Sequence, residues 1–289
     1  MDIIKLENVS YIYGADTPFE KKALDSINLT VKKGSITGII GHTGSGKSTL
    51  VQILVGLLKP CGTYYFDSHN VWENEKKPQG VKFNVGLVMQ YPEYQLFDET
   101  VYEDIAYAPK NMGLSDEEIH QRVREAAIYT GLSDEILNKS PFELSGGQKR
   151  RAAIAGVLAM RPSVLVLDEP AAGLDPRGRE EILGGLRSYR DRIGATVIIV
   201  SHSMEDMAKY CDDIIVLKDG RVSFTGTSAE VFSDSSRLVE CGLNVPQITE
   251  ICKKLKEKGL DLDQTVLNVE DAARIIKELF DKKRRGKDA

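Results

Sequence analysis

The chain has 289 residues, 42% of them hydrophobic, so it exceeds a single average domain and can bury a substantial core. Its formal net charge of −5 argues against general nucleic-acid binding, whose electrostatic footprint is basic. No run of 18 or more apolar residues and no signal-peptide pattern occurs, so we expect any membrane role to require a partner. The cysteines have no metal-ligand spacing and are expected to be reduced thiols, mostly buried: Cys61, Cys211, Cys241 and Cys252.

A glycine-rich segment follows the first predicted strands. Residues 3–40 alternate as strands around a lysine-bearing turn, and the apolar run 36–40 leads into Gly41, His42, Thr43, Gly44, Ser45, Gly46, Lys47, Ser48 and Thr49. Such glycines let backbone N–H groups cradle phosphate oxygens at the N-terminus of a helix. We therefore expect an ATP-binding P-loop, with Lys47 on the β- and γ-phosphates and Ser48 on Mg²⁺, before a helix over residues 48–58. An ordinary glycine-rich turn is the alternative, which the preceding strand and the motifs below disfavour.

Residues 91–160 differ in composition from their surroundings, with helical segments that carry Asp, Glu and Arg faces. Ser115 followed by acids is a good helix N-cap. Near the end of this region, Ser145 and the Gly146 and Gly147 amides precede a helix that begins around Gln148. Donors at a helix N-terminus favour a phosphate, so this segment is a second candidate phosphate contact.

Two further apolar runs end in polar side chains. Residues 164–167 are followed by Asp168 and Glu169, and residues 196–200 are followed by Ser201 and His202. Ligands bind at the carboxyl ends of strands in open α/β sheets. Asp168 is expected to hold Mg²⁺ through water and Glu169 to act as general base on the water that attacks the γ-phosphate. For an isolated acidic pair helix capping is the usual role, and a lone histidine after a strand is more often structural.

The C-terminal residues 241–289 are predicted to form two amphipathic helices. Apolar residues recur at helical spacing in two sets, Ile248, Ile251, Cys252 and Leu255, then Ala272, Ile275, Ile276 and Leu279. These faces are expected to pack either on the core of the same chain or on a second protomer. The basic run 282–285 suits the solvated C-terminus of a helix.

The order of the motifs resembles that of the ATP-binding cassette (ABC) ATPases over roughly residues 3–230. The most informative stretch is Leu144-Ser145-Gly146-Gly147-Gln148, which lies between the P-loop and the strand ending at Asp168 and Glu169. The resemblance implies an α/β P-loop NTPase fold, with a mixed sheet core and a helical subdomain. We expect an ATPase domain over residues 1–240, with a helical subdomain at about 91–160, and a C-terminal helical extension over 241–289.

Further site residues are implied by this resemblance. His202 matches the histidine that contacts the γ-phosphate, and Gln90 matches the glutamine that touches Mg²⁺ or the attacking water. Tyr13 matches the aromatic residue that stacks on adenine, with Tyr11 as the competitor because both rings are predicted on one strand face. Asp175 is expected at the boundary between two ATPase domains.

The resemblance also implies a dimer. ATP is held between the P-loop of one protomer and the signature of another, namely Ser145, Gly146, Gly147 and Gln148. Ala171 stands where many relatives have Thr, which removes a hydroxyl but no expected ligand.

Within this superfamily the chain most resembles the ATPase subunits of energy-coupling factor (ECF) transporters, which import vitamins and transition-metal ions. The resemblance rests on Tyr13-Gly14, residues 17–20 and 23–24, the P-loop, residues 148–156 and residues 172–176. The His42-Thr43 pair with Ala172-Gly173 is similar to the second of two paralogous ATPases. Residues 59–63 depart from the family pattern by a shorter turn that contains no site residue.

The ECF resemblance implies three kinds of partner and a place in the cell. The chain would pair with a paralogous ATPase or with itself, and bind a transmembrane coupling subunit through residues 91–97, chiefly Tyr94, Leu96 and Phe97. A separate membrane protein would bind the transported substrate, and no nucleic acid is expected. The chain would then be peripheral, on the cytoplasmic face of the membrane.

Two other functions fit parts of the sequence. The ATPase of a different ABC importer is the nearer alternative. A nucleotide-gated DNA-repair or chromosome scaffold is the distant one, but such proteins carry a long coiled coil between the P-loop and the signature. Here Ser48 and Ser145 are only 97 positions apart, with no sustained heptads.

Overall fold

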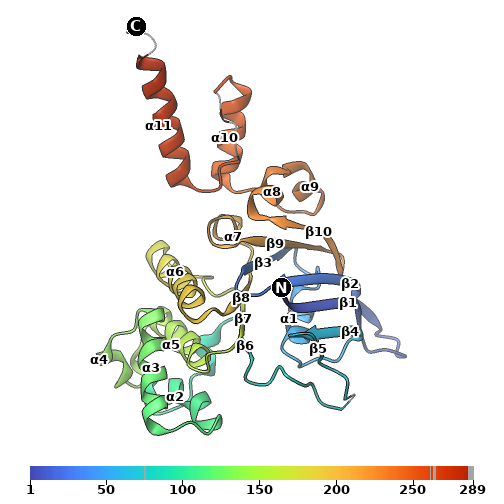
Figure 1. Ribbon diagram of the computed structural model, residues 1–289, viewed down its shortest axis with the longest axis vertical. Coiled ribbons are helices and arrows are strands. Elements are labelled where there is room, and N and C mark those ends of the chain that lie inside the picture. The colour runs from blue at the N-terminus through green and yellow to red at the C-terminus, as the bar shows by residue number, and fades with distance from the viewer. Residues whose placement is uncertain (75, 261, 263–264, 286–289) are drawn as a thin grey trace.

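The computed structural model describes residues 1–289 except 75, 261, 263–264 and 286–289, and for 280 and 282–285 only the backbone. The described residues form a four-stranded sheet and a six-stranded sheet, with helices around them (Figure 1). The smaller sheet has the order β2-β1-β4-β5 and is antiparallel. Its strands are β1 (Asp2–Tyr13), β2 (Lys21–Lys32), β4 (Cys61–Phe66) and β5 (His69–Asn70).

The larger sheet has the order β10-β9-β3-β8-β7-β6 and is parallel except for β10. Its strands are β3 (Ile36–Gly41), β6 (Val85–Val88), β7 (Val164–Asp168), β8 (Thr196–Val200), β9 (Asp213–Lys218) and β10 (Arg221–Thr227). Central strands β3 and β8 are buried along their whole length, as parallel strands covered on both faces must be.

The two faces of the larger sheet belong to two cores, because side chains alternate along a strand. Ile39, Val166 and Ile198 pack with the smaller sheet and with helix α1 (Lys47–Leu54), so α1 lies between the sheets. Helix α1 ends four residues earlier than expected, and Gly56 follows in the left-handed conformation. Ile40 and Leu167 face the opposite core, which contains most of the other helices.

The segment 91–160 is helical, with its helices gathered on one side of the larger sheet (Figure 1). It contains η1 (Pro92–Gln95), α2 (Val101–Asn111), α3 (Asp116–Thr130), α4 (Asp134–Leu137), η2 (Pro141–Glu143) and α5 (Gly146–Leu158). Ser115 caps α3 as expected, because its hydroxyl accepts from the Glu118 N–H at 3.3 Å. The remaining helices of the core are α6 (Pro176–Ile193), α7 (Met204–Tyr210), α8 (Ser228–Ser233) and α9 (Ser235–Glu240).

The C-terminal residues form α10 (Gln247–Glu257) and α11 (Val269–Arg285), which project from the end of the core that carries α8 and α9 (Figure 1). Their buried side chains form a third cluster, Cys252, Leu262, Val266 and Ala272, separate from both main cores. Partly buried residues join it: Ile248, Leu255, Leu260, Ile275 and Leu279. The two helices therefore pack mainly on each other. The side chains of the basic run 282–285 lie outside the described residues.

Candidate functional site

The predicted P-loop connects β3 to α1, and its backbone requires glycine. Gly46 caps α1 with a φ of 103°, in the left-handed region, and a Cβ there would lie 2.6 Å from Leu24 Cδ2. Gly41 is equally constrained, because its Cβ would lie 2.4 Å from the Leu217 carbonyl oxygen. The loop is thus held against β2 and β9, and the N-terminus of α1 opens at the carboxyl end of the parallel strands.

Lys47 lies over this loop rather than in solvent. Its Nζ donates to the carbonyl oxygens of Gly41 at 2.7 Å and His42 at 3.0 Å. Burial lowers the pKa of Lys47, and the charges of Glu169 and Asp168 oppose that shift. An ammonium group held at the first turn of a helix is suited to phosphate oxygens.

A cleft of about 380 Å³ extends from the P-loop to the smaller sheet. Tyr13 lines it together with Gly44, Gly46, Lys47, Ser48 and Thr49. The Tyr13 hydroxyl lies 3.3 Å from Thr49 Oγ1, and the ring is 39% exposed. Tyr11 contacts Tyr13 edge to face, with 4.8 Å between ring centroids, but it packs against the core beneath. An exposed ring beside a phosphate loop is suited to stack on a base, and Tyr13 is more exposed to the cleft than Tyr11.

Asp168 and Glu169 follow β7 at the same edge of the sheet. Burial raises the pKa of Asp168, and Lys47 and His202 oppose this. Glu169 has a φ of 52°, a left-handed conformation that is unusual for a residue with a side chain, and its N–H donates to Val200 O at 2.9 Å. That bond ties the turn after β7 to the end of β8.

The two carboxylate oxygens of Glu169 have different surroundings. Oε2 accepts from the Ser201 hydroxyl at 3.2 Å, whereas Oε1 is buried and, among the described residues, has no hydrogen-bond partner. His202 Nε2 lies 3.7 Å from Oε1, and the histidine is about half exposed. Burial raises the pKa of Glu169, against the lowering effect of His202, the Ser201 hydroxyl and the His202 N–H. A fixed carboxylate with one unused, desolvated oxygen is suited to accept a proton from water.

Gln90 lies two residues beyond β6, which pairs in parallel with β7, so it follows the strand next to the one ending at Asp168. Its side chain is exposed. Asp175 is the N-cap of α6, and its Oδ1 accepts from the Gly178 N–H at 2.7 Å. The Asp175 carboxylate is thus a helix cap as well as the predicted interface residue.

The signature segment lies apart from the cleft. Ser145 caps α5 in a reciprocal pair, because its hydroxyl accepts from Gln148 N at 3.4 Å and Gln148 Oε1 accepts from Ser145 N at 3.0 Å. Ser145 and Gly146 are exposed, and buried Leu144 anchors the turn. No signature residue is among those that line the cleft beside Tyr13. The chain therefore brings together Lys47, Glu169 and His202, but not the signature.

Mg²⁺ prefers oxygen ligands and usually keeps phosphate or water in part of its shell. The hydroxyl of Ser48 and the carboxylate of Asp168 are ligands of that type, and Asp168 lies close enough to Lys47 for their charges to interact. Within the described residues no group of three or more His, Cys, Asp or Glu forms a complete metal cage. The residues present thus fit an ion shared with a bound phosphate.

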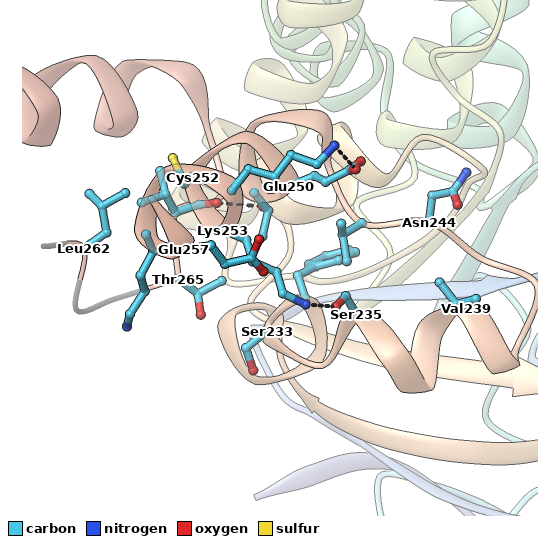
Figure 2. Close-up of a pocket in the computed structure, with 16 residues that line it drawn as sticks. Ser233, Ser235, Val239, Asn244, Glu250, Cys252, Lys253, Glu257, Leu262 and Thr265 are labelled. Atoms are coloured by element: carbon cyan, nitrogen blue, oxygen red, sulfur yellow. Dashed lines mark hydrogen bonds and ion pairs between the residues drawn. The ribbon is translucent and has the colours of Figure 1, made fainter. Parts of the chain in front are cut away.

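A second cavity, of about 580 Å³, lies between α10 and the end of the core (Figure 2). Phe232, Val239 and Val245 line it, and Lys253 Nζ donates across it to Ser235 Oγ at 2.9 Å. None of its lining residues belongs to a nucleotide motif. This cavity marks where the C-terminal helices meet the core.

Sequence reasoning missed several residues of the cleft. Lys21, Lys22 and Asp219 line it from two hairpin segments, and Ser201 holds Glu169. Of these residues only Ser201 could have been found from the sequence, because it lies between a predicted buried strand and His202. The others are brought to the cleft by the packing of β2 beside the β9–β10 turn, where the Asp25 N–H donates to Gly220 O at 2.8 Å.

The fold and the arrangement of motifs define a P-loop ATPase of the ABC type. The ABC transporter family model matches residues 24–172. The solved structure of CbiO1 from Clostridium perfringens, described as part of the ABC transporter complex CbiONQ, superposes with a TM-score of 0.74. It is 40% identical and covers 87% of this chain and 99% of that one. A dimeric ATP-binding cassette bound to ADP and phosphate gives a TM-score of 0.68 at 31% identity, over 78% of this chain and 98% of that one.

Relatives of higher sequence identity show to which group within the ABC transporter family the chain belongs. The energy-coupling factor transporter ATP-binding protein EcfA2 of Caldanaerobacter subterraneus subsp. tengcongensis is 51% identical over 93% of this chain and 94% of its own length. The EcfA2 protein of Clostridium acetobutylicum is 49% identical over 98% of this chain and 99% of its own length. The chain therefore belongs to the energy-coupling factor transporter ATP-binding proteins of the ABC transporter family. Among the described residues, no helix is long and apolar enough to span a membrane.

Proposed function

We infer that this chain binds and hydrolyses ATP as one half of an ATPase pair, and that the pair powers uptake through a separate membrane subunit. The observation that carries the hydrolytic part is the unpartnered, buried Glu169 Oε1 beside His202 and the P-loop edge. The near full-length identity to EcfA2 proteins supports the transport part.

The residues of one chain supply most of the chemistry. The P-loop amides and Lys47 would hold the β- and γ-phosphates, Tyr13 would stack on adenine, and Ser48 with Asp168 and Gln90 would hold Mg²⁺, which supplies charge neutralisation when bound. Glu169 Oε1 takes the proton of the attacking water as the new oxygen–phosphorus bond forms and the bond to ADP breaks. Ser201 keeps that carboxylate oriented, and His202 contacts the γ-phosphate.

The signature completes the site from the other protomer. Ser145 and Gly146 are exposed and Gly147 is half-buried at the start of α5, away from the cleft of their own chain. Donors in that position are complementary to the γ-phosphate of a nucleotide on a second cassette, and Gln148 holds the turn. Whether that cassette is a paralogue or a second copy, ATP would lie at the interface.

The segment after Gln90 would bind the transmembrane coupling subunit. Tyr94 is 83% exposed and Phe97 61% exposed, and Phe97 packs edge to face on the half-exposed ring of Tyr107. Exposed aromatic residues gathered in this way favour a partner helix over solvent. Leu96 is partly buried and packs against the main core, so the surface would be chiefly aromatic.

Co-purification in mild detergent, with mass spectrometry of the recovered proteins, tests the transport part of this proposal. We expect a membrane coupling subunit, a substrate-binding membrane protein and an ATPase partner, which would place the chain at the cytoplasmic face of the membrane. Recovery of the ATPase without any membrane subunit would contradict the transport role.

A further inference from the structure

Arg150 lies one turn into α5, after the signature, and its side chain is only 6% exposed. It approaches Glu93 of η1 with two nitrogens: Nε donates to Oε2 at 3.1 Å and Nη2 to Oε1 at 2.9 Å. Such a fork fixes direction as well as distance, because the planar guanidinium must face the carboxylate.

The third nitrogen of Arg150 reaches another segment. Nη1 donates to the carbonyl oxygen of Ala172, in the turn between β7 and α6 that ends at Asp175. The same turn approaches the signature a second time, since a Cβ on Gly147 would lie 3.5 Å from Leu174 Cδ2. One guanidinium therefore joins the segment after Gln90, the signature helix and the turn that leads to Asp175.

We propose that Arg150 is a positioning residue that sets the signature and the Asp175 turn according to the position of η1. This inference rests on the proposed function, in which both of those segments act on the partner protomer. Tyr94 and Phe97, on either side of the end of η1, face outward, whereas Glu93 in the same short helix faces Arg150. A displacement of η1 by a bound partner helix thus moves Glu93, and through it Arg150.

Arg150 is buried and Glu93 is mostly buried, which favours a rigid link between them. A buried guanidinium cannot exchange Glu93 for water, and leaving either charge alone in the interior is strongly unfavourable. The pair therefore moves as a unit. A lysine would keep the charge but would lose the planar guanidinium, which bonds Glu93 and Ala172 simultaneously.

The test replaces both charges together, so that no buried charge is left unpaired. The variant Glu93→Gln with Arg150→Met is compared with Glu125→Gln with Arg161→Met. The control removes a partly buried Arg–Glu pair that joins Glu125 of α3 to Arg161, which follows α5, with 2.5 Å between Arg161 Nη2 and Glu125 Oε2. Each full-length variant is purified with the ATPase subunit it pairs with. Affinity for a fluorescent ATP analogue, melting temperature and turnover at saturating ATP are measured.

We expect the affinity of the Arg150 variant to match the control within about twofold, because its own P-loop is unchanged, while turnover falls about tenfold or more. Arg150→Lys should recover part of the lost turnover. Turnover equal to that of the control, or a fall in affinity and melting temperature that accounts for it, would overturn the proposal. The comparison uses the ATPase pair alone, so it is decided separately from whether a membrane subunit co-purifies.

Discussion

The two phosphate-binding regions of this chain differ in how much of their geometry the chain builds by itself. Lys47, Glu169 and His202 are fixed by neighbouring parallel strands that end at one edge of the larger sheet. The signature instead begins α5, in the group of helices on one side of that sheet, with its donors exposed (Figure 1). The region of Lys47, Glu169 and His202 thus has nearly all of its geometry built within one chain. Under the proposed function the other region acts only across an interface, which would couple ATP hydrolysis to association of the protomers.

Removing the base should have the largest effect. Glu169→Gln keeps the shape of the side chain but cannot take a proton, so turnover in the assembled complex should fall by about 10²-fold or more while ATP still binds. Steady-state phosphate release measures this. Glu180→Gln, an exposed acid on α6 that pairs with Lys209, is the matched control and should keep normal turnover. A Glu169→Gln variant that hydrolyses ATP at the normal rate would remove Glu169 from its role.

A large residue in the signature should separate binding from closure. Ser145→Arg should leave ATP affinity of the isolated chain nearly intact, yet block the ATP-dependent dimer by filling the γ-phosphate position. Ser145→Ala is the control for loss of the α5 cap, which costs about 1 kcal/mol of stability. Equilibrium binding and light scattering compare them with Lys47→Ala. If Ser145→Arg loses ATP binding as fully as Lys47→Ala, the two regions do not act on different nucleotides.

The aromatic surface after Gln90 should be needed for the membrane partner but not for nucleotide. Tyr94→Ser with Phe97→Ser should reduce recovery of the membrane subunit severalfold while ATP binding persists, because apolar contact area is lost. Phe142→Ser, which removes an equally exposed ring on η2, should have no such effect. Normal recovery of the double variant would place the docking surface elsewhere.

The C-terminal helices are predicted to keep the protomers associated between ATP cycles. Ending the chain after Pro246 keeps Leu243 and Val245, which contact the main core. Because α10 and α11 bury apolar residues mainly on each other, the melting temperature of the shortened chain should change little. Light scattering should show that its nucleotide-free dimer dissociates. A shortened chain that stays dimeric without ATP would refute the association role, and a large loss of melting temperature would indicate packing on the core instead.

Ser201→Ala should have the smallest effect, a shift in the pH dependence of ATP turnover. Burial already raises the pKa of Glu169, and the Ser201 hydroxyl lowers it by bonding the charged form. Without that hydroxyl the pKa rises further, so more of the base is protonated at a given pH. The acidic limb of the turnover profile should move to higher pH, with little change at alkaline pH. A profile that does not move would show that Ser201 leaves the basicity of Glu169 unaffected.

Local patterns in the sequence predicted most of the fold. The P-loop, the strand ending at Asp168 and the helix cap at Ser115 each depend on a few consecutive residues, and the structure has these elements where they were expected. The membership in the ECF family was predicted as well and is confirmed by the relatives. The assignment of individual site residues stays a prediction.

Features that depend on distant segments were not predictable. Lys22 and Asp219 meet at the cleft because two hairpins pack together, and the contact of Arg150 with Glu93 spans 57 positions. Leu96 was expected to belong to the surface that binds the coupling subunit, yet it is partly buried and packs against the main core. Neither composition nor periodicity carries such information.

The separate apolar cluster of α10 and α11 makes the C-terminal helices a module of their own. Its contacts with the rest of the chain include the hydrogen bond of Lys253 to Ser235 and that of the Gln247 N–H to Glu205 at 3.4 Å. Glu270 pairs with Lys209, and Leu267, between the two helices, packs against the main core. A module attached in this way can be exchanged or redesigned without repacking the sheets. If the two helices hold the protomers together, as predicted above, the choice of partner protomer can be altered there while Lys47, Glu169 and His202 stay unchanged.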